Sequence, residues 1–376
     1  MDNFIKNDLL PEGFKVLLPE EAEKEEFISR KILDFFSKFG YSLVKTPLVE
    51  YEDNNTEDKL LEDILDPFIL MEPDTKKVLI LRPDITLQVA KLAGSKLIKK
   101  NRPLRLTYKG EVFRNIKNIY QTDRQFKQIG AEIIGGPNLQ SLLEVLDVTI
   151  KALAKLKIKN ITIDFTLPAI SRYLEKSIDF KKREGFVIQE AMDNKNGTLI
   201  KETKYSYVKD IIELSGPLEK VRKNFKTLKV PKPIKLMIQD FFNTVSKIKK
   251  KFPNLSITMD ITEAQSFLKY KDLAFKIYNK ENANALAIGG NYELTNKETG
   301  VGTTIMLNKI TDSITLIKPK KVYVPYNTDP TASILKKKQF VFIKELSPKK
   351  LGLKEAKRLK CDFLINKNGK IERVKY

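Results

Sequence analysis

Apolar residues recur at helical spacing over residues 20–40, EEAEKEEFISRKILDFFSKFG. On a helix they would form one broad face, made of Phe27, Ile28, Ile32, Leu33, Phe35 and Phe36. Acidic residues fill the first turn, where they interact favourably with the helix dipole, and Gly40 marks the end of the pattern. The pattern therefore predicts an amphipathic helix over this segment.

Alternating apolar and polar positions follow in YSLVKTPLVEYED, residues 41–53. The alternation predicts one strand, but Pro47 within it cannot donate a hydrogen bond to a sheet ladder. We therefore expect this strand at a sheet edge, an interface or a bulge. Residues 68–73 and 77–82 predict a hairpin, and Asp84 is a good N-cap for the helix expected after it.

A second hairpin is predicted by residues 110–136, GEVFRNIKNIYQTDRQFKQIGAEIIGG, in which a charged loop joins two strand-like segments. Gln128 and Glu132 lie at even spacing on the second segment, so their side chains point to one face of the sheet. The rest of that face is apolar, and buried polar groups need partners. The spacing therefore favours a polar pocket over a structural role for these two residues.

The later pattern divides the chain. A helix is expected from about 139 to 155 and a strand in ITIDFTL, whereas charged helical patterns dominate from about 170 to 250 and predict a mostly helical insertion. Strands resume in LSITMDI, FKIYN, ALAIGG and GVGTTIML, before a tail with three short strands and one helix. We expect an α+β domain over residues 1–318, with the insertion inside it, and a short α/β C-terminal tail over residues 319–376.

The composition excludes several kinds of chemistry. The apolar runs are far shorter than a membrane span, and the first residues lack the pattern of a signal peptide. The 376 residues include one cysteine, Cys361, and no histidine. These counts exclude an internal disulfide framework, a thiolate metal cluster and histidine-based catalysis. We expect a cytoplasmic protein with no metal, no cofactor and no membrane contact.

The formal net charge of +21 has two interpretations. A basic face gains affinity for nucleic acid by releasing phosphate counterions. Alternatively the charge is compositional, because it is mostly lysine spread along the chain without regular aromatic or arginine neighbours. Phosphate-specific recognition favours the arginine fork, and arginine is scarce here. We favour the compositional interpretation and do not expect nucleic acid as a partner.

Five segments taken together resemble the catalytic domain of class II aminoacyl-tRNA synthetases, and most closely its histidyl branch. The family's dimer-forming first motif is matched by TPLVEYED, and its substrate loop by LRPDITLQVAKLAG. The second motif is matched by YKGEVFRN with RQFKQIGAEIIG, and the third by AIGGNYEL and GVGTTIMLNKI. The resemblance covers residues 10–318, most weakly in the insertion, and implies an antiparallel sheet flanked by helices.

The departures from this family concern ATP. The family's second motif has Phe-Arg-x-Glu, in which the arginine takes the α-phosphate and the glutamate reads adenine; here Arg114 is kept and Ile116 replaces the glutamate. In the third motif Lys309 replaces an arginine and Met306 a small residue. Lysine lacks the planar fork, and one lost donor costs about 100- to 1,000-fold in rate. The comparison implies a fold that has lost amino-acid activation and has no catalytic residues.

A catalytically silent chain of this kind, with a short tail, looks like the regulatory subunit of ATP phosphoribosyltransferase. That resemblance implies a short-form catalytic subunit as partner in the first step of histidine biosynthesis, and a self-dimer within a hetero-oligomer. It also implies L-histidine as a candidate effector for feedback. Two alternatives stay open: a synthetase-like accessory protein that binds tRNA or another nucleic acid, and a divergent histidyl-tRNA synthetase.

The resemblance also supplies candidates for binding histidine: Asp84, Thr86, Arg114, Gln128, Glu132 and Tyr270. In the family the glutamate meets the imidazole, and the glutamine meets the carboxyl end of the ligand. Asp84 is either the partner of a ligand ammonium or simply an N-cap. Arg114 is either a carboxylate partner or a surface ion pair.

Two further family elements are altered. The Arg-Gly-x-x-Tyr-Tyr element corresponds to DITEAQSFLKYKDLAF, where Tyr270 is the candidate second tyrosine and no arginine lies nearby. Lys269 or Arg114 would have to replace the missing guanidinium. Gly289 and Gly290 match the family's Gly-Gly-Arg-Tyr, although as bare chemistry a Gly-Gly-Asn run predicts a turn.

Overall fold

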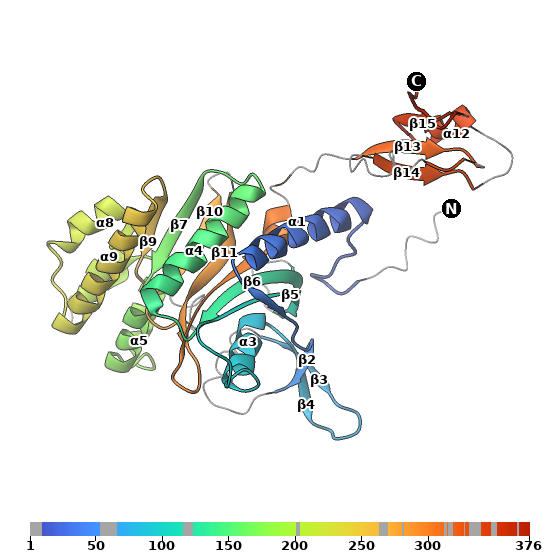
Figure 1. The fold of residues 1–376 in the computed structure, drawn as a ribbon. Helices are drawn as coiled ribbons and strands as arrows, with labels where there is room; N and C mark the ends of the chain where they lie inside the picture. The colour runs from blue at the N-terminus through green and yellow to red at the C-terminus, as the bar shows by residue number, and fades with distance from the viewer. Residues whose placement is uncertain are drawn as a thin grey trace. The chain divides into compact units, whose positions relative to one another are not determined.

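The computed structural model of the chain describes residues 10–52, 66–115, 123–200, 204–262, 270–279, 282–311, 314, 319–326, 328–330, 340–346, 352–366 and 368–376. The chain divides into two compact units, Met1–Ile314 and Thr315–Tyr376, whose elements are labelled in Figure 1. The boundary expected after residue 318 falls beside residues 315–318. These lie outside the described part of the chain, so that boundary stays a prediction.

A nine-stranded sheet forms the centre of the first unit, in the order β1-β5-β6-β12-β11-β10-β7-β9-β8. Its strands are β1 (Ser42–Val44), β5 (Leu104–Phe113), β6 (Gln125–Ile134), β7 (Ile161–Thr166), β8 (Ser215–Pro217), β9 (Ser256–Asp260), β10 (Ala274–Asn279), β11 (Asn282–Glu293) and β12 (Thr299–Met306). Neighbouring strands are antiparallel except in the pairs β1–β5 and β7–β9. The predicted α+β fold with a mainly antiparallel sheet is confirmed.

Helices cover both faces of this sheet (Figure 1). Strand β6 shows which helix lies on which face. Lys127 forms an ion pair with Glu25 of α1, whereas the next residue, Gln128, accepts a hydrogen bond from the backbone nitrogen of Ile85 in α3. Successive strand residues point to opposite faces, so α1 and α3 lie on opposite sides. The helices around this part of the sheet are α1 (Pro19–Lys38), α3 (Ile85–Gly94), α4 (Asn138–Lys155) and α10 (Leu307–Thr311).

A second, three-stranded sheet has the order β2-β4-β3. It consists of β2 (Val49–Tyr51), β3 (Phe68–Met71) and β4 (Val78–Leu81), and the antiparallel pair β3–β4 confirms the predicted hairpin. The single strand predicted over residues 41–53 is wrong, because β1 joins the large sheet and β2 joins this one. The chain changes sheet at Pro47, whose carbonyl oxygen accepts hydrogen bonds from the side chains of Arg82 and Gln88.

The segment from 168 to 251 is mostly helical. It contains α5 (Pro168–Ser177), α6 (Arg183–Asp193), the 3-10 helix η2 (Gly197–Leu199), α7 (Tyr207–Ile212), α8 (Leu218–Phe225) and α9 (Lys232–Lys251). Figure 1 shows α8 and α9 beside β9. The facing sides of these two helices are apolar, and the rings of Phe225 and Phe242 lie 5.1 Å apart between centroids. The segment also adds the short strand β8 to the edge of the large sheet.

The glycine pair Gly289–Gly290 lies inside β11, so the predicted turn is wrong. Gly290 pairs with Gly302 of β12. A Cβ atom at Gly290 would lie 2.5 Å from the carbonyl oxygen of Leu273 and 2.7 Å from the ring of Tyr270. Glycine is needed here because backbone and ring approach the strand closely, not because the chain turns.

The second unit contains a four-stranded sheet in the order β14-β13-β15-β16. Its elements are β13 (Lys320–Val324), β14 (Phe340–Lys344), α12 (Gly352–Arg358), β15 (Phe363–Ile365) and β16 (Ile371–Arg373). Tyr323 packs with Ala356 and Cys361, whereas Val322 packs in a separate cluster with Ile365, so both faces of the sheet are buried. Strand β16 was not predicted, because its three residues include two charged ones.

Candidate functional site

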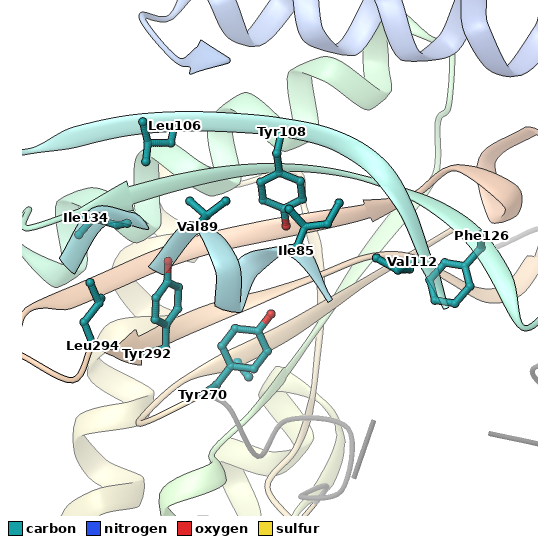
Figure 2. Packing of buried hydrophobic residues seen from close by; sticks show 12 residues of the cluster. Ile85, Val89, Leu106, Tyr108, Val112, Phe126, Ile134, Tyr270, Tyr292 and Leu294 are labelled. Atoms are coloured by element: carbon teal, nitrogen blue, oxygen red, sulfur yellow. The ribbon is translucent and has the colours of Figure 1, made fainter. Parts of the chain in front are cut away.

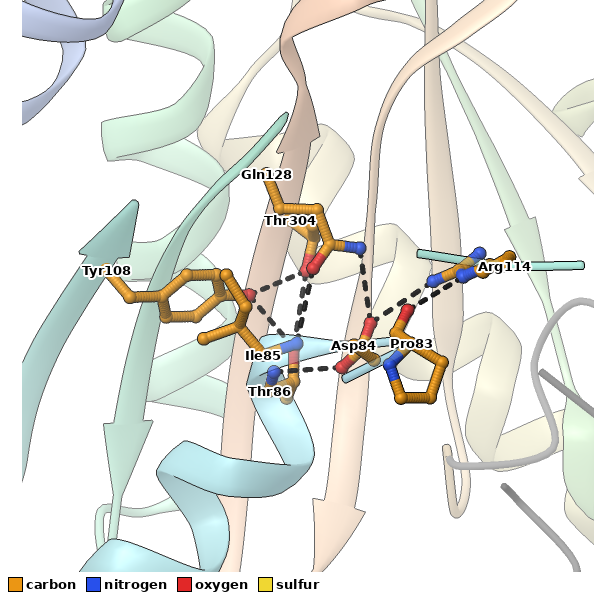
Figure 3. A network of polar contacts seen from close by, with 8 residues as sticks. All are labelled: Pro83, Asp84, Ile85, Thr86, Tyr108, Arg114, Gln128 and Thr304. Atoms are coloured by element: carbon orange, nitrogen blue, oxygen red, sulfur yellow. Dashed lines mark hydrogen bonds and ion pairs between the residues drawn. The ribbon is translucent and has the colours of Figure 1, made fainter. Parts of the chain in front are cut away.

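A cluster of buried polar side chains lies between the large sheet and the start of α3 (Figure 3). On this face Gly130 of β6 stands opposite Tyr108 of β5 and Thr304 of β12. A Cβ atom at Gly130 would overlap the ring of Tyr108, so the tyrosine lies across the glycine. Two of the cluster's members, Tyr108 and Thr304, were missed by the sequence analysis. The available signals were the even spacing of Thr304 from Met306 on β12 and the position of Tyr108 in the motif segment YKGEVFRN.

Asp84 combines the two roles considered for it. Its Oδ1 atom accepts a hydrogen bond from the backbone nitrogen of Thr86 at 2.8 Å, which makes it the N-cap of α3 as predicted. Its Oδ2 atom lies 3.4 Å from Nη2 of Arg114 and accepts a 3.3 Å hydrogen bond from Nε2 of Gln128. The carboxylate is buried, so its charge is stabilised by these neighbours.

Contacts with neighbouring residues fix the side chain of Arg114. Its Nε atom donates to the carbonyl oxygen of Pro83 at 2.8 Å, and its guanidinium lies 5.3 Å from the ring centroid of Phe126. Its side chain is 12% exposed, so the ion pair with a nearby acid considered from sequence is present but is buried rather than at the surface. Burial lowers the pKa of Arg114, and the negative charge of Asp84 opposes that shift.

Gln128 joins β6 to α3. Besides its bond to Asp84, its Oε1 atom accepts from the backbone nitrogen of Ile85 at 3.3 Å (Figure 3). Beside it, the hydroxyl of Thr86 lies 2.9 Å from that of Tyr108, which in turn lies 2.8 Å from that of Thr304. Burial, together with nearby carboxylates, raises the pKa of Tyr108 well above its usual range. Tyr108 therefore stays a neutral hydroxyl.

Glu132 is fully buried and accepts a 2.9 Å hydrogen bond from the hydroxyl of Tyr292. A Cβ atom at Gly302 would overlap its carboxylate, so that glycine leaves the space in which the acid lies. Burial and the negative charge of Glu132 raise the pKa of Tyr292 well above normal. Tyr292 lies in the motif segment AIGGNYEL but was not predicted as a site residue.

Tyr270 completes the set. Its side chain is buried, and burial followed by the negative charges of Asp84 and Glu132 raises its pKa well above normal. Figure 2 shows Tyr270, Tyr292 and Tyr108 around the first turns of α3. The structure thus brings all six candidates to one face of the sheet. Hydrogen bonds and an ion pair link Asp84, Thr86, Arg114 and Gln128 directly, and electrostatic proximity relates Tyr270 and Glu132 to them.

The positions that depart from the ATP-binding pattern lie close by. Met306 stands opposite Gln128 in the β12–β6 register, and Lys309 lies on α10 directly after β12. Ile116 and Lys269 lie outside the described residues. No arginine lies near Tyr270 in the sequence, but in the fold Arg172 of α5 donates to the Tyr270 carbonyl oxygen at 2.7 Å. Sequence distance concealed this contact.

The cluster combines charged groups with neutral hydrogen-bonding groups. It offers the carboxylates of Asp84 and Glu132, the guanidinium of Arg114 and several neutral hydroxyls, an arrangement that suits a ligand carrying both charges. Within the described residues, no group of three or more acidic or cysteine side chains is placed to hold a metal ion. None of the described helices is long and apolar enough to cross a membrane.

Comparisons with known proteins identify relatives of this chain. A family model described as histidyl-tRNA synthetase matches residues 13–310. An ATP phosphoribosyltransferase regulatory subunit of Paramagnetospirillum magneticum is 27% identical over 97% of each chain, and one of Gluconobacter oxydans is 29% identical over 94% of each. A solved structure from Bacillus halodurans, described as such a regulatory subunit/histidyl-tRNA synthetase, has a TM-score of 0.70 at 19% identity. It covers 86% of this chain and 87% of its own, and it shares the fold.

Proposed function

Because the chain belongs to the histidyl-tRNA synthetase family, in the branch of ATP phosphoribosyltransferase regulatory subunits, we propose that its pocket has become a sensor of L-histidine. The chain is a non-catalytic regulatory subunit in histidine biosynthesis. In the proposal it acts in the cytoplasm with a short-form catalytic subunit. A cluster of buried polar side chains, close to positions that depart from the family's ATP-binding pattern, is the observation that carries the proposal.

The fit to histidine follows from charge and hydrogen bonding. Asp84 and Glu132 offer carboxylates to positive groups of a ligand, and Arg114 offers a guanidinium to a carboxylate. Histidine carries an ammonium and a ring that can take a second proton, and its carboxylate matches the guanidinium. Glu132 lies where a buried acceptor can meet an imidazole N–H, as in the family pattern.

Reconstitution tests this role. Mixing the chain with a short-form catalytic subunit should give phosphoribosyl-ATP formation that millimolar histidine inhibits. In calorimetry of the complex, Glu132→Gln should weaken histidine binding at least tenfold, because the variant loses a charged hydrogen bond worth about 1.5–3 kcal/mol. Glu219→Gln, an exposed change on α8, is the matched control and should bind as the wild type does. The absence of histidine binding at millimolar concentration would contradict the proposed sensor.

The loss of ligation rests on how the ATP-side groups are used. Met306 stands opposite Gln128, at a position where the family has a small residue. A methionine there takes space that the family leaves for the nucleotide. Pyrophosphate exchange with histidine and ATP should therefore stay at the level of an enzyme-free reaction, and exchange above that level would restore the synthetase alternative.

The three-stranded sheet supports a self-dimer. On β3, Ile69 is 65% exposed, Leu70 44% and Met71 67%. Consecutive strand residues point to opposite faces, so β3 is apolar on both sides, and it is an edge strand in this sheet. An open apolar edge is an aggregation hazard unless it is covered, and a second copy of the chain would cover it with the same surface.

Light scattering during size-exclusion chromatography tests the dimer. Ile69→Lys with Met71→Lys should give a monomer, because the charges would be buried at the interface. Phe186→Lys changes an equally exposed apolar residue on α6 and should leave the dimer intact. A dimer that survives the β3 changes would place the interface elsewhere.

One observation favours the nucleic-acid alternative. A groove of about 800 Å³ between α8 and α9 is lined by five cations and one acid: Arg222, Lys226, Lys235, Lys249, Lys250 and Glu219. Such a groove would bind phosphates with steep salt dependence. We expect no tRNA shift in gel assays at 150 mM salt. A specific shift, lost on Lys235→Glu with Lys250→Glu, would favour the alternative.

A further inference from the structure

The position of Tyr270 in the pocket depends on the backbone that follows it. Residues 270–273 lead from Tyr270 into β10, and the chain bends at Lys271 and Asp272. The side chain of Tyr270 is buried against Gly290 of β11, so a shift of this backbone would withdraw the ring from Asp84 and Glu132. Two polar side chains from other elements hold the bend.

The first is Asn291 of β11. Its Oδ1 atom accepts hydrogen bonds from the backbone nitrogens of Asp272 at 3.2 Å and Leu273 at 2.7 Å. Its Nδ2 atom donates to the carboxylate of Asp272 at 3.0 Å, and its carbonyl oxygen accepts from the Lys271 nitrogen at 2.6 Å. Asn291 stands where the family has an arginine after the glycine pair. It thus binds the backbone nitrogens of residues 271–273.

The second is Arg172 of α5, from the helical segment. Its Nη1 atom donates to the carbonyl oxygen of Tyr270 at 2.7 Å, and Nη2 donates to that of Lys271. The guanidinium is half-buried, which lowers the pKa of Arg172, and the negative charge of Asp272 opposes that shift. Arg172 thus binds the carbonyl groups of Tyr270 and Lys271, and Asn291 binds the backbone nitrogens of residues 271–273.

The geometry requires arginine's fork. Successive carbonyl groups point to opposite sides of an extended strand, so one side chain reaches both only when the backbone bends between them. A planar guanidinium offers two parallel N–H groups at a fixed spacing, which a lysine ammonium does not. The fork therefore selects the bent backbone that directs Tyr270 into the pocket.

We propose that Arg172 is a positioning residue that holds Tyr270 in the histidine pocket by binding two successive carbonyls, and that it links this pocket to α5 of the helical segment. The inference rests on the proposed histidine site and deepens it. It adds to the proposed site a residue of α5, outside the strands and the start of α3 from which the other site residues come. Arg172 itself does not touch the ligand; it acts through the backbone of Tyr270.

The test uses the full chain and two readouts. The first is the rate of tryptic cleavage after the exposed Lys271, followed by mass spectrometry without ligand, and the second is histidine affinity by calorimetry. Arg172→Gln should raise the cleavage rate and weaken histidine binding, each by about tenfold, the scale of one charge-assisted hydrogen bond. Arg172→Lys should be intermediate. The control Arg222→Gln removes a guanidinium bound to Ser246 on the neighbouring helices and should change neither.

A double variant separates positioning from general stability. If Arg172 acts through Tyr270, Arg172→Gln should weaken histidine binding less than twofold in a Tyr270→Phe background, because coupled residues are non-additive. Fully additive effects, or unchanged cleavage after Lys271 in Arg172→Gln, would overturn the proposal. If the wild type binds no histidine while Arg172→Gln still accelerates cleavage, the sensor proposal fails and the positioning of Tyr270 stands.

Discussion

Asp84 caps α3 through Oδ1 and contacts Arg114 and Gln128 through Oδ2. A carboxylate has two oxygens and about four lone-pair sites, so capping and charge pairing do not compete. The sequence left these roles as alternatives because it shows one residue and not its two oxygens. At the residue scale, the side chains of the site share hydrogen-bond and ion-pair partners, so each buried charge is stabilised by the others.

Removing the charge of Asp84 should therefore destabilise the fold. Asp84→Asn keeps an acceptor for the Thr86 nitrogen but leaves Arg114 buried beside a neutral group, which should cost about 3 kcal/mol in the free energy of unfolding. Asp147→Asn breaks an exposed pair with Lys151 on α4 and should cost about 0.5 kcal/mol or less. Urea denaturation measures both, and equal losses would show that the Asp84 pair carries no special weight.

Gly302 gives a second prediction at this scale. A Cβ atom there would overlap the Glu132 carboxylate, so Gly302→Ala must move the acid away from Tyr292. We expect a loss of about 1–3 kcal/mol in stability, typical of overpacking, together with loss of histidine binding. Calorimetry measures the binding. Unchanged affinity in Gly302→Ala would mean that the position of Glu132 is not critical for the ligand.

Much of the site was predictable from spacing, and the rest was not, for a physical reason. Gln128 and Glu132 share a face because strand residues alternate, and Asp84 caps a helix whose start the sequence marks. Tyr108 and Thr304 meet across Gly130 only after three strands pair in register, which no local pattern encodes. Arg172 reaches Tyr270 from 98 residues away in the chain.

At the scale of elements, the local sequence pattern predicts an element correctly where the whole segment packs in one place in the fold. The helix α1 and the hairpin β5–β6 follow directly from period and turn signals. The failures lie where tertiary partners decide. Residues 41–53 alternate throughout, yet they divide between two sheets at Pro47, and the Gly289–Gly290 pair stays extended because two neighbouring strands hold it.

Helix α3 offers a test of element stability. Gly94 ends this helix, and a Cβ atom there would have its nearest neighbour at 4.0 Å, the Leu294 side chain. Gly94→Ala should therefore raise the free energy of unfolding by about 0.5–1 kcal/mol, because alanine loses less backbone entropy on folding. Gly110→Ala is the opposite case, since its Cβ would meet Arg82 and Ile85, and it should destabilise. Thermal melts of both variants check the signs.

At the scale of the whole molecule, the charge is unevenly distributed. Residues 315–376 contain 17 lysines and arginines against five acids, a net charge of +12, while the whole chain carries +21. Residues 1–314 therefore carry the remaining +9 over a much longer stretch. The sequence analysis attributed the positive charge to lysines spread along the chain. That interpretation fits the first unit better than the second.

This concentration predicts how the second unit responds to salt. Like charges on a small domain repel one another, and at low ionic strength that repulsion extends well beyond contact distance, whereas at about 0.5 M it is confined to a few ångströms. A fragment of residues 315–376 should therefore melt about 5 °C higher in 500 mM than in 20 mM sodium chloride, which corresponds to roughly 1 kcal/mol in a domain of this size. The fragment of residues 1–314 controls for general salt effects and should shift much less, because its +9 is diluted over five times as many residues. Equal shifts in the two fragments would mean that the charge of the second unit is already compensated within its own fold.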